Sequence, residues 1–339
     1  MTRKRRLLLF IILLILFLLV APSTVLYSFG YRFDFDTKKI TQTGGFYFKV
    51  LPKSAQVYID KKLSKRTDFF FGAVFINNLL PQKYEVEIKK DGYHSWKKTL
   101  EIKEKQVTDA KNVVLFSQNP ELKALSQNVE EFFVSPDQKK MILKEAGEFA
   151  EGKPSSAQAE RRARDERSSA SHPFASAREK EWSLKLLELD KNIKSHLASQ
   201  KDLATSSLTQ FVDTFFGAEQ KIGRGRASQD LGKIAYSANA EVWVMFLKEE
   251  FGQPQKKAGE RLLVARFSEK IGDIFWLTNH YLIFNTGNKI KIAEVDDRNG
   301  INIIDLADFE KPKIFFNQAN KKLYILSERK LYASQRLLP

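Results

Sequence analysis

The chain of 339 residues contains no cysteine, which excludes disulfide bonds, thiolate metal sites and cysteine nucleophiles. Histidine is nearly as rare. The four histidines, which lie far apart and have no carboxylate at ligand spacing, are His94, His172, His196 and His280. The His-Glu-x-x-His, Gly-x-Ser-x-Gly and phosphate-loop motifs are also missing. We therefore assign no catalytic, cofactor-binding or metal-binding residue and predict that the protein is not an enzyme, although a Ser/His/Asp triad assembled from distant segments stays open.

Only one stretch is long and apolar, and it lies at the N-terminus. It comprises fourteen consecutive apolar residues, which begin at Leu7 and end at Val20. Counted on to residue 29 it is about 23 residues long, enough for a helix to cross a hydrocarbon core roughly 30 Å thick. The four cations before it are Arg3, Lys4, Arg5 and Arg6. Because basic flanks resist translocation, we predict a cytoplasmic tip at residues 1–6, a single-pass transmembrane helix at residues 7–29 in the cell membrane, and an extracytoplasmic location for the rest.

A cleaved signal peptide is the main alternative to this uncleaved anchor. It has the same basic start but a shorter apolar core, and its cleavage site needs small residues at set spacing. Ala21 is the one small residue at the end of the run, and Pro22 follows it, which is unfavourable at a cleaved bond. The length of the run and the poor cleavage site both favour the anchor.

The net charge of the chain is +15, and the basic tip supplies four of these charges, which leaves +11 for the exported part. A basic exterior suggests acidic neighbours such as anionic lipid headgroups, cell-wall polymers or nucleic acid. The charges are spread along the chain, however, and this favours an ordinary solvated surface rich in lysine. We expect membrane lipid as one partner and envelope proteins or cell-wall polymer as others, with nucleic acid less favoured.

Residues 30–117 show the pattern of short β-strands. Residues 31–36 alternate aromatic and polar side chains, and we assign residues 30–43 to a juxtamembrane strand and linker. In residues 84–89 apolar side chains alternate with charged ones, as in a strand with one buried face. Turn residues separate such runs throughout the region. The pattern predicts an antiparallel β-sandwich over residues 44–117.

The same region resembles a PEGA domain. The resemblance is carried by the turn at residues 52–55 and by residues 57–61, 80–86 and 91–96. Two departures affect turns and leave the strand pattern intact: Lys53-Ser54 replaces a Glu-Gly pair, and Gln82-Lys83 lacks the usual glycine. The resemblance implies a β-sandwich found on surface proteins, with no known chemistry of its own.

Aromatic residues in this region have two interpretations. Tyr93, His94 and Trp96 are candidate ligand-contact residues, because aromatic rings beside a histidine can stack on sugars. The alternative, which we favour, is that both rings pack in the core where a turn enters a strand. We likewise expect the three phenylalanines at residues 69–71 to lie in the core, or else on a loop that faces the membrane.

Residues 118–339 carry a repeated strand–turn pattern. Ser135-Pro136-Asp137 suits a tight turn between two strands, since proline presets φ and aspartate bonds back to the backbone. Weaker copies occur at residues 231–236, 279–284 and 320–326, and the last two begin about 41 residues apart, the size of a propeller blade. The turn resembles that of TolB-like and WD-type β-propellers. We predict an all-β chain with an N-terminal transmembrane helix, a PEGA-like antiparallel sandwich and propeller-like repeats.

A loop near the end of this region imitates part of a calcium-binding loop. Val295 and Leu306 occupy the first and twelfth ligand positions, and because neither offers a side-chain oxygen, an EF-hand is excluded. The Asn299-Gly300 pair between two apolar runs is typical of a hairpin turn. We predict the hairpin, and a calcium site of another type stays open.

Residues 146–181 differ from their surroundings. They are rich in alanine, serine, arginine and glutamate and almost free of β-branched residues. Such a segment buries too little apolar surface to order itself, so we predict a disordered or partly helical insertion between two strands. An arginine-rich arm for nucleic acid is the functional alternative, which the interspersed acids weaken.

These observations predict a non-enzymatic, membrane-anchored envelope protein that displays an extracytoplasmic binding or scaffolding module. One alternative is an exported hydrolase, of the peptidase or glycosidase type, that uses the propeller. Another is an anchored receptor for an anionic polymer or nucleic acid, which the net charge suggests.

Overall fold

The computed structural model describes residues 3–35, 37–135, 137–146, 182–188, 196–199 and 225–338. The insertion predicted at residues 146–181 lies outside the described residues, apart from Ala146. The chain divides into two compact units. The first contains the described parts of Met1–Glu121, Ile222–Phe316 and Gln335–Pro339, and the second those of Leu122–Lys221 and Asn317–Ser334.

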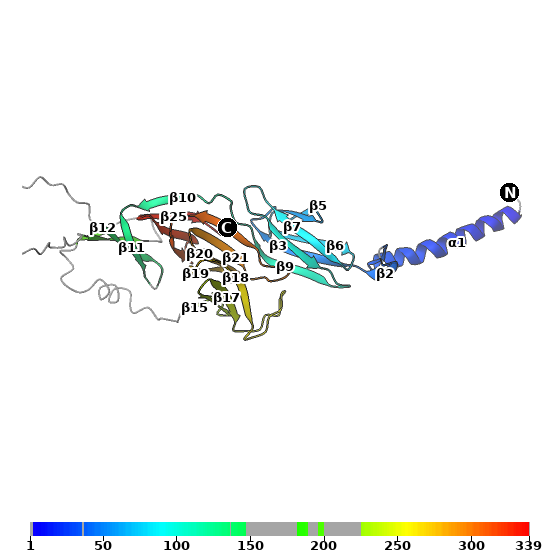
Figure 1. The fold of residues 1–339 in the computed structure, drawn as a ribbon. Helices are drawn as coiled ribbons and strands as arrows, with labels where there is room; N and C mark the ends of the chain where they lie inside the picture. The colour runs from blue at the N-terminus through cyan, green and yellow to red at the C-terminus, as the bar shows by residue number, and fades with distance from the viewer. Residues whose placement is uncertain are drawn as a thin grey trace, which may run out of the picture. The chain divides into compact units, whose positions relative to one another are not determined.

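The first unit begins with the helix α1 (Arg3–Ser28), which has 26 residues and buries none of them (Figure 1). It starts before the apolar run because arginine and lysine are good helix formers. The hydroxyls of Ser23, Thr24 and Ser28 each donate to a carbonyl four residues earlier, at 2.8 Å, so these polar groups are satisfied within the helix. α1 is long and apolar enough to cross a membrane, a criterion that a signal sequence also meets.

A small hairpin follows the helix directly. Its strands are β1 (Tyr31–Asp34) and β2 (Lys39–Gln42), which pair antiparallel with Phe33 opposite Ile40. Gly30 ends the helix with a φ of 80°, a conformation that glycine adopts without strain. The amide of Thr43 donates to the Gly30 carbonyl at 2.9 Å, so the hairpin returns the chain to the end of the helix.

The β-sandwich of the first unit has two sheets. The three-stranded sheet, in the order β6-β3-β9, is made of β3 (Gly44–Leu51), β6 (Ala73–Leu79) and β9 (Val107–Val114). The four-stranded sheet, in the order β5-β4-β7-β8, is made of β4 (Gln56–Ile59), β5 (Lys62–Arg66), β7 (Lys83–Lys89) and β8 (Trp96–Glu101). Residues of both sheets enter one buried core, so each sheet covers the apolar face of the other.

One strand pair corrects the prediction of a purely antiparallel sandwich. β3 and β9 pair parallel, with Gly45 opposite Val107 and Leu51 opposite Val114. The physical reason is the long connection between them: the chain passes through β4 to β8 before it returns, and it then enters β9 from the same end as β3. The other sandwich pairs are antiparallel.

The alternating pattern at residues 84–89 is confirmed as a half-buried strand. Tyr84, Val86 and Ile88 of β7 point into the core, while the residues between them are exposed or half-buried. On β3, the rings of Phe46 and Phe48 are fully buried and stacked at 5.3 Å. A period of two therefore placed the core residues correctly, because successive side chains of a strand face opposite ways.

Beyond the sandwich, the described residues form four-stranded sheets. One contains β11 (Val129–Val134), β12 (Lys140–Ala146), β13 (Trp182–Glu188) and β14 (His196–Ser199), in chain order. A second contains β15 (Gly225–Ala227), β16 (Lys233–Ala238), β17 (Glu241–Phe246) and β18 (Arg261–Arg266), and a third β19 (Ile271–Thr278), β20 (Tyr281–Thr286), β21 (Lys289–Glu294) and β22 (Ile303–Asp308). The fourth, in the order β10-β25-β24-β23, contains β10 (Leu122–Ser126), β23 (Lys313–Asn317), β24 (Lys322–Ser327) and β25 (Lys330–Arg336).

These sheets are propeller-like. Three of them are four-stranded meanders, the form of a propeller blade, and the fourth pairs the first strand of the region with the last. Each of the three weaker sequence copies contributes the strand that lies second across its sheet, counted from β15, β19 and β23 respectively; these strands are β16, β20 and β24. The repeat found in the sequence therefore marks the same place in successive sheets.

The tight turn predicted at Ser135 has a second copy at Ser228, which the sequence pattern did not predict. Ser135 Oγ lies 2.5 Å from Asp137 Oδ1 and accepts from the Lys140 amide at 2.9 Å. Ser228 makes the same pair of bonds, to Asp230 at 2.6 Å and from the Lys233 amide at 2.9 Å. A serine and an aspartate two residues apart thus close both turns before the second strand of a sheet.

Candidate functional site

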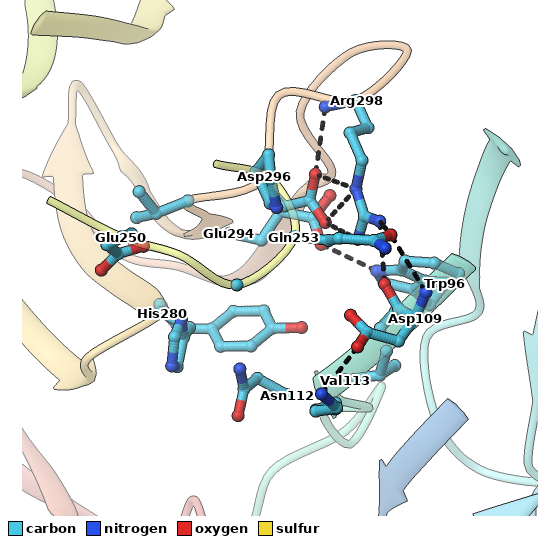
Figure 2. Close-up of a pocket in the computed structure, with 16 residues that line it drawn as sticks. Trp96, Asp109, Asn112, Val113, Glu250, Gln253, His280, Glu294, Asp296 and Arg298 are labelled. Atoms are coloured by element: carbon cyan, nitrogen blue, oxygen red, sulfur yellow. Dashed lines mark hydrogen bonds and ion pairs between the residues drawn. The ribbon is translucent and has the colours of Figure 1, made fainter. Parts of the chain in front are cut away.

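The first unit contains a polar pocket of about 120 Å³ between the sandwich and the repeat sheets (Figure 2). β8 and β9 form its sandwich side, and β20, β21 and the loop at residues 250–254 form the other. Six of the residues that line it carry an acidic or basic side chain, and His280 adds an imidazole. These charged groups, and the buried Lys98 behind them, decide what chemistry the pocket can perform.

Lys98, on β8, forms the centre of the contact between the two sides. Its side chain is 1% exposed, and its Nζ lies 2.6 Å from Oε1 of Glu294, whose side chain is 4% exposed. The same ammonium donates to the backbone carbonyls of Asp296 at 2.7 Å, Arg298 at 3.1 Å and Gly300 at 2.6 Å. These carbonyls belong to the loop between β21 and β22, so the lysine occupies a cage of oxygen atoms.

The same cage shows what the oxygen atoms of the calcium-like loop bind in this structure. The loop is a hairpin connection, as predicted, with Asn299 and Gly300 at φ values of 52° and 94° and with β21 and β22 paired antiparallel. Its oxygen atoms converge on a cation, but that cation is the ammonium group of Lys98. A lysine has three N–H donors and no acceptor, which suits a site made of carbonyls and a carboxylate.

Glu294 is the acceptor for several further groups. Its Oε2 accepts from Nε1 of Trp96 at 2.7 Å, and its Oε1 accepts from the backbone amide of Asn302 at 3.0 Å and the side-chain amide at 2.8 Å. Burial raises the pKa of Glu294, while Lys98 and Trp96 act in the opposite direction. The carboxylate is therefore desolvated but fully hydrogen-bonded, the arrangement that a buried charge requires.

Arg298 and Gln253 occupy the exposed edge of β9. Arg298 binds Asp296 through Nε and Nη2, at 3.1 Å to Oδ1 and 2.6 Å to Oδ2, and its Nη1 donates to the Asp109 carbonyl at 2.8 Å (Figure 2). Gln253 accepts from the Asp109 amide and donates to the Val107 carbonyl, both at 3.1 Å. The two side chains thus occupy the backbone groups of an edge strand that would otherwise be free to pair with another strand.

Tyr281 and His280 complete the pocket from β20 and the turn before it. The buried hydroxyl of Tyr281 accepts from the Val114 amide at 3.1 Å, and its ring contacts Phe116 edge-on at 5.3 Å. Burial, with Glu294 nearby, raises the pKa of Tyr281 well above its ordinary value. Burial, and next the nearby Lys233, lower the pKa of the His280 imidazole below its ordinary value.

The arrangement supports structure more directly than it supports catalysis. Lys98, Glu294, Asp296 and Arg298 bind one another or the backbone, and the buried Lys233 forms an ion pair with Glu250. Within the described residues, no group of three or more histidines or acids is placed to hold a metal ion. The ion pair of Lys98 with Glu294 and the hydrogen bonds from Lys98 to the loop carbonyls therefore join the sandwich to the repeat sheets of the first unit.

The three candidate ligand-contact residues take different positions. Trp96 is 3% exposed and packs in the sandwich core against Phe48, with ring centres 6.4 Å apart. Tyr93 is partly buried against the same core, and His94 donates its backbone amide to the Phe116 carbonyl at 2.8 Å. Nε2 of His94 is buried and lacks a hydrogen-bond partner among the described residues, and burial lowers the pKa of this side chain. The Trp96 ring thus packs in the core, and its indole N–H donates to Glu294.

The residues assigned to the anchor all lie on α1. Arg3, Lys4, Arg5 and Arg6 form its first turn, and Leu7 and Val20 bound its apolar run. All of them are exposed. They form no part of the pocket.

The expectation that residues 69–71 belong to the core is wrong. Phe69, Phe70 and Phe71 are each 74% exposed. Asp68 causes this, because its Oδ1 accepts from the amides of Phe70 at 2.9 Å and Phe71 at 2.6 Å and so winds the backbone tightly. The loop directs three aromatic rings to the surface of the sandwich.

Sequence reasoning missed the residues that hold the pocket together. Lys98 follows Lys97 in an alternating strand, where both read as solvated charges, and Gln253 lies in a loop with no motif. The partners of Lys98 are distant in the sequence: Asp296 lies 198 positions after it and Gly300 lies 202 positions after it. The one sequence signal is the polar loop at residues 294–300, whose oxygen-bearing side chains indicate a cation-binding loop.

No protein-family model matches the chain, and no curated protein matches it. Among solved structures, the chain aligns with Hsv2p of Kluyveromyces lactis at 12% identity and a TM-score of 0.22, over 59% of this chain and 46% of that one. It aligns with the Cps50 (Swd1) β-propeller domain of Myceliophteria thermophila at 10% identity and a TM-score of 0.25, over 74% and 80%. It also aligns with XC5397, a gluconolactonase from Xanthomonas campestris, at 12% identity and a TM-score of 0.25, over 75% and 82%. The chain thus spans about half the length of the Hsv2p chain. The propeller-like character of the repeat sheets is shown by the strand order of this chain itself.

Proposed function

We propose that this protein is a non-enzymatic, single-pass membrane protein of the cell envelope, which displays a binding or scaffolding module outside the membrane. The observation that carries the proposal is α1, a 26-residue helix whose apolar surface is exposed all round. An apolar helix that packs on no core has to be covered by something, and a bilayer covers all of its faces at once. The PEGA-like nature of the sandwich is part of the proposal and is supported by its turn and strand residues.

The orientation follows from charge. Four cations immediately precede the apolar run, whereas the nearest cations after the helix are Arg32, Lys38 and Lys39, so the N-terminal flank is the more basic one. The positive flank of a first helix stays in the cytoplasm, so the sandwich and the repeat sheets are external. Arg32 is also engaged locally, because its Nη1 donates to the carbonyls of Tyr27 and Tyr31, both at 2.8 Å.

The non-enzymatic assignment is supported by how the pocket uses its polar groups. A general acid, base or nucleophile must be available to a substrate. In this pocket Glu294 already accepts from Lys98, Trp96 and Asn302. Activity-based hydrolase probes test the rival hypothesis: the full-length protein should remain unlabelled, and specific labelling would establish an exported hydrolase.

The absence of cysteine makes a topology experiment direct. A cysteine at the exposed Gln118 should react with a membrane-impermeant maleimide in intact cells, whereas a cysteine at Thr2 should react only after lysis. The cysteine-free parent chain is the control for background labelling. Protection of position 118 in intact cells, with labelling on lysis, would reverse the orientation and contradict the proposal. A shortened protein without the first residues would instead indicate a cleaved signal peptide.

A further inference from the structure

The β1–β2 hairpin carries an exposed apolar face next to the helix. Phe33 and Ile40 are opposite one another in the hairpin, so their side chains lie on the same face, and the ring of Phe35 meets that of Phe33 edge-on at 5.1 Å. All three are exposed, Phe35 to 81%. Tyr27 and Phe29, at the end of the helix, are also exposed. Five apolar side chains thus surround the point where the chain leaves α1.

The hairpin is attached to the helix. Arg32 places its guanidinium 3.4 Å from the centre of the Tyr27 ring and donates to the Tyr27 carbonyl. Gln42 donates to the Phe29 carbonyl at 3.4 Å, and both the amide and the hydroxyl of Thr43 donate to the Gly30 carbonyl at 2.9 Å. These bonds satisfy carbonyls at the helix C-terminus and hold the hairpin at a set position on it.

The length of the helix places this face at the edge of a bilayer. At 1.5 Å per residue, the helical segment from Leu7 to Leu26 spans about 30 Å, which equals the hydrocarbon thickness. Tyr27 and Phe29 then lie at the boundary. β1 begins three residues after the last residue of α1, so the hairpin lies within the headgroup layer that follows.

The charges of the hairpin suit the same surroundings. Lys38 and Lys39 lie at its turn and are exposed. Aromatic rings at the boundary and lysines beside lipid phosphates are the usual composition of a membrane interface. The hairpin combines both within twelve residues of chain, directly after an apolar helix.

We propose that the β1–β2 hairpin is an interfacial lipid-binding element, in which Phe33, Phe35 and Ile40 enter the boundary between acyl chains and headgroups while Lys38 and Lys39 contact lipid phosphates. It sets the depth of α1 and holds the start of the sandwich against the membrane surface. This inference depends on the proposed membrane anchor. It goes further by naming a second lipid contact and the chemistry of its ligand.

The experiment uses the full-length protein in nanodiscs and a single cysteine that carries an environment-sensitive fluorophore. Ile40→Cys reports on the hairpin, Leu13→Cys on the helix, and Asp91→Cys, in an exposed turn of the sandwich, on solvent. Nitroxide-labelled lipids report depth through quenching. The discs contain phosphatidylcholine alone or with a quarter phosphatidylglycerol.

We expect the label at position 40 to emit at shorter wavelength than the label at position 91 and to be quenched most by a nitroxide near the headgroup. Phe33→Ser with Phe35→Ser should remove most of this quenching. Lys38→Glu with Lys39→Glu should remove the part that depends on phosphatidylglycerol. All four side chains are exposed, so urea unfolding of these variants should match the parent.

Three results would overturn the inference. If the label at position 40 behaves like the one at position 91 while the label at position 13 is quenched at the bilayer centre, the anchor stands and the interfacial element is wrong. A blue-shifted label at position 40 without lipid quenching would mean that protein covers the face, from this chain or a second copy. An unquenched label at position 13 would refute the anchor itself and the inference with it.

Discussion

Replacing Lys98 with methionine tests whether the buried ion pair joins the sandwich to the repeat sheets. Methionine fills a similar volume, so the substitution removes the charge and the hydrogen bonds without a large cavity. Glu294, whose side chain is 4% exposed, then lacks its counter-ion, and three loop carbonyls lack their donor. Removing one partner of a buried pair costs about 3–5 kcal/mol.

Lys97 offers a matched control on the same strand. Its side chain is 56% exposed and lies 2.9 Å from Glu87. A surface ion pair of this kind contributes at most about 1 kcal/mol. Lys97→Met should therefore leave the free energy of unfolding almost unchanged, although it removes the same charge from the neighbouring position.

The pH dependence gives a second readout. Burial raises the pKa of Glu294, so the folded protein holds this proton more tightly than the unfolded chain does. The stability that this contributes is complete at acid pH and is lost as the pH rises through the folded pKa. Without Lys98 the pKa should rise further, so the cost of Lys98→Met should be small near pH 4 and largest at pH 7 and above.

The measurement is urea unfolding of the detergent-solubilised full-length protein, followed by tryptophan fluorescence. Adding Glu294→Gln to Lys98→Met removes the uncompensated charge while an oxygen acceptor remains for Trp96, so we expect the double variant to recover roughly 2 kcal/mol. If Lys98→Met and Lys97→Met unfold at the same urea concentration at pH 8, the buried pair does not carry the contact and the reasoning is refuted.

Three further predictions follow from the same site. Gln253→Ala frees the edge of β9 and should cost about 1–2 kcal/mol for its two backbone hydrogen bonds, with faster aggregation on heating; unchanged aggregation and stability would contradict its role. Burial lowers the pKa of His94 and His280, so the stability that these histidines contribute is present above their unfolded pKa near 6.5 and is lost as the pH falls through their folded pKa. In urea titrations, His280→Gln should therefore reduce the decrease in the free energy of unfolding between pH 7 and pH 5. Calcium should leave the melting temperature unchanged, because Lys98 occupies the loop oxygens, and an upward shift with added calcium would show that a metal displaces the lysine.

Local features of the fold could be predicted from the sequence. The apolar run predicted a helix because fourteen consecutive apolar residues exceed what a short strand or a loop would carry. The alternation at residues 84–89 predicted a half-buried strand, and Ser135 with Asp137 predicted a turn, since both patterns depend on neighbours within a few residues. The repeat spacing predicted a series of similar sheets, and the four-stranded meanders agree with it.

Partners distant in sequence could not be predicted in the same way. Lys97 and Lys98 are indistinguishable as residues, yet one is exposed and the other is desolvated by a loop about 200 residues away. The parallel pairing of β3 with β9 depends on the path of the five strands between them. Whether a side chain faces water, lipid or a counter-ion is set by what the whole chain packs around it, and a local pattern contains no record of that packing.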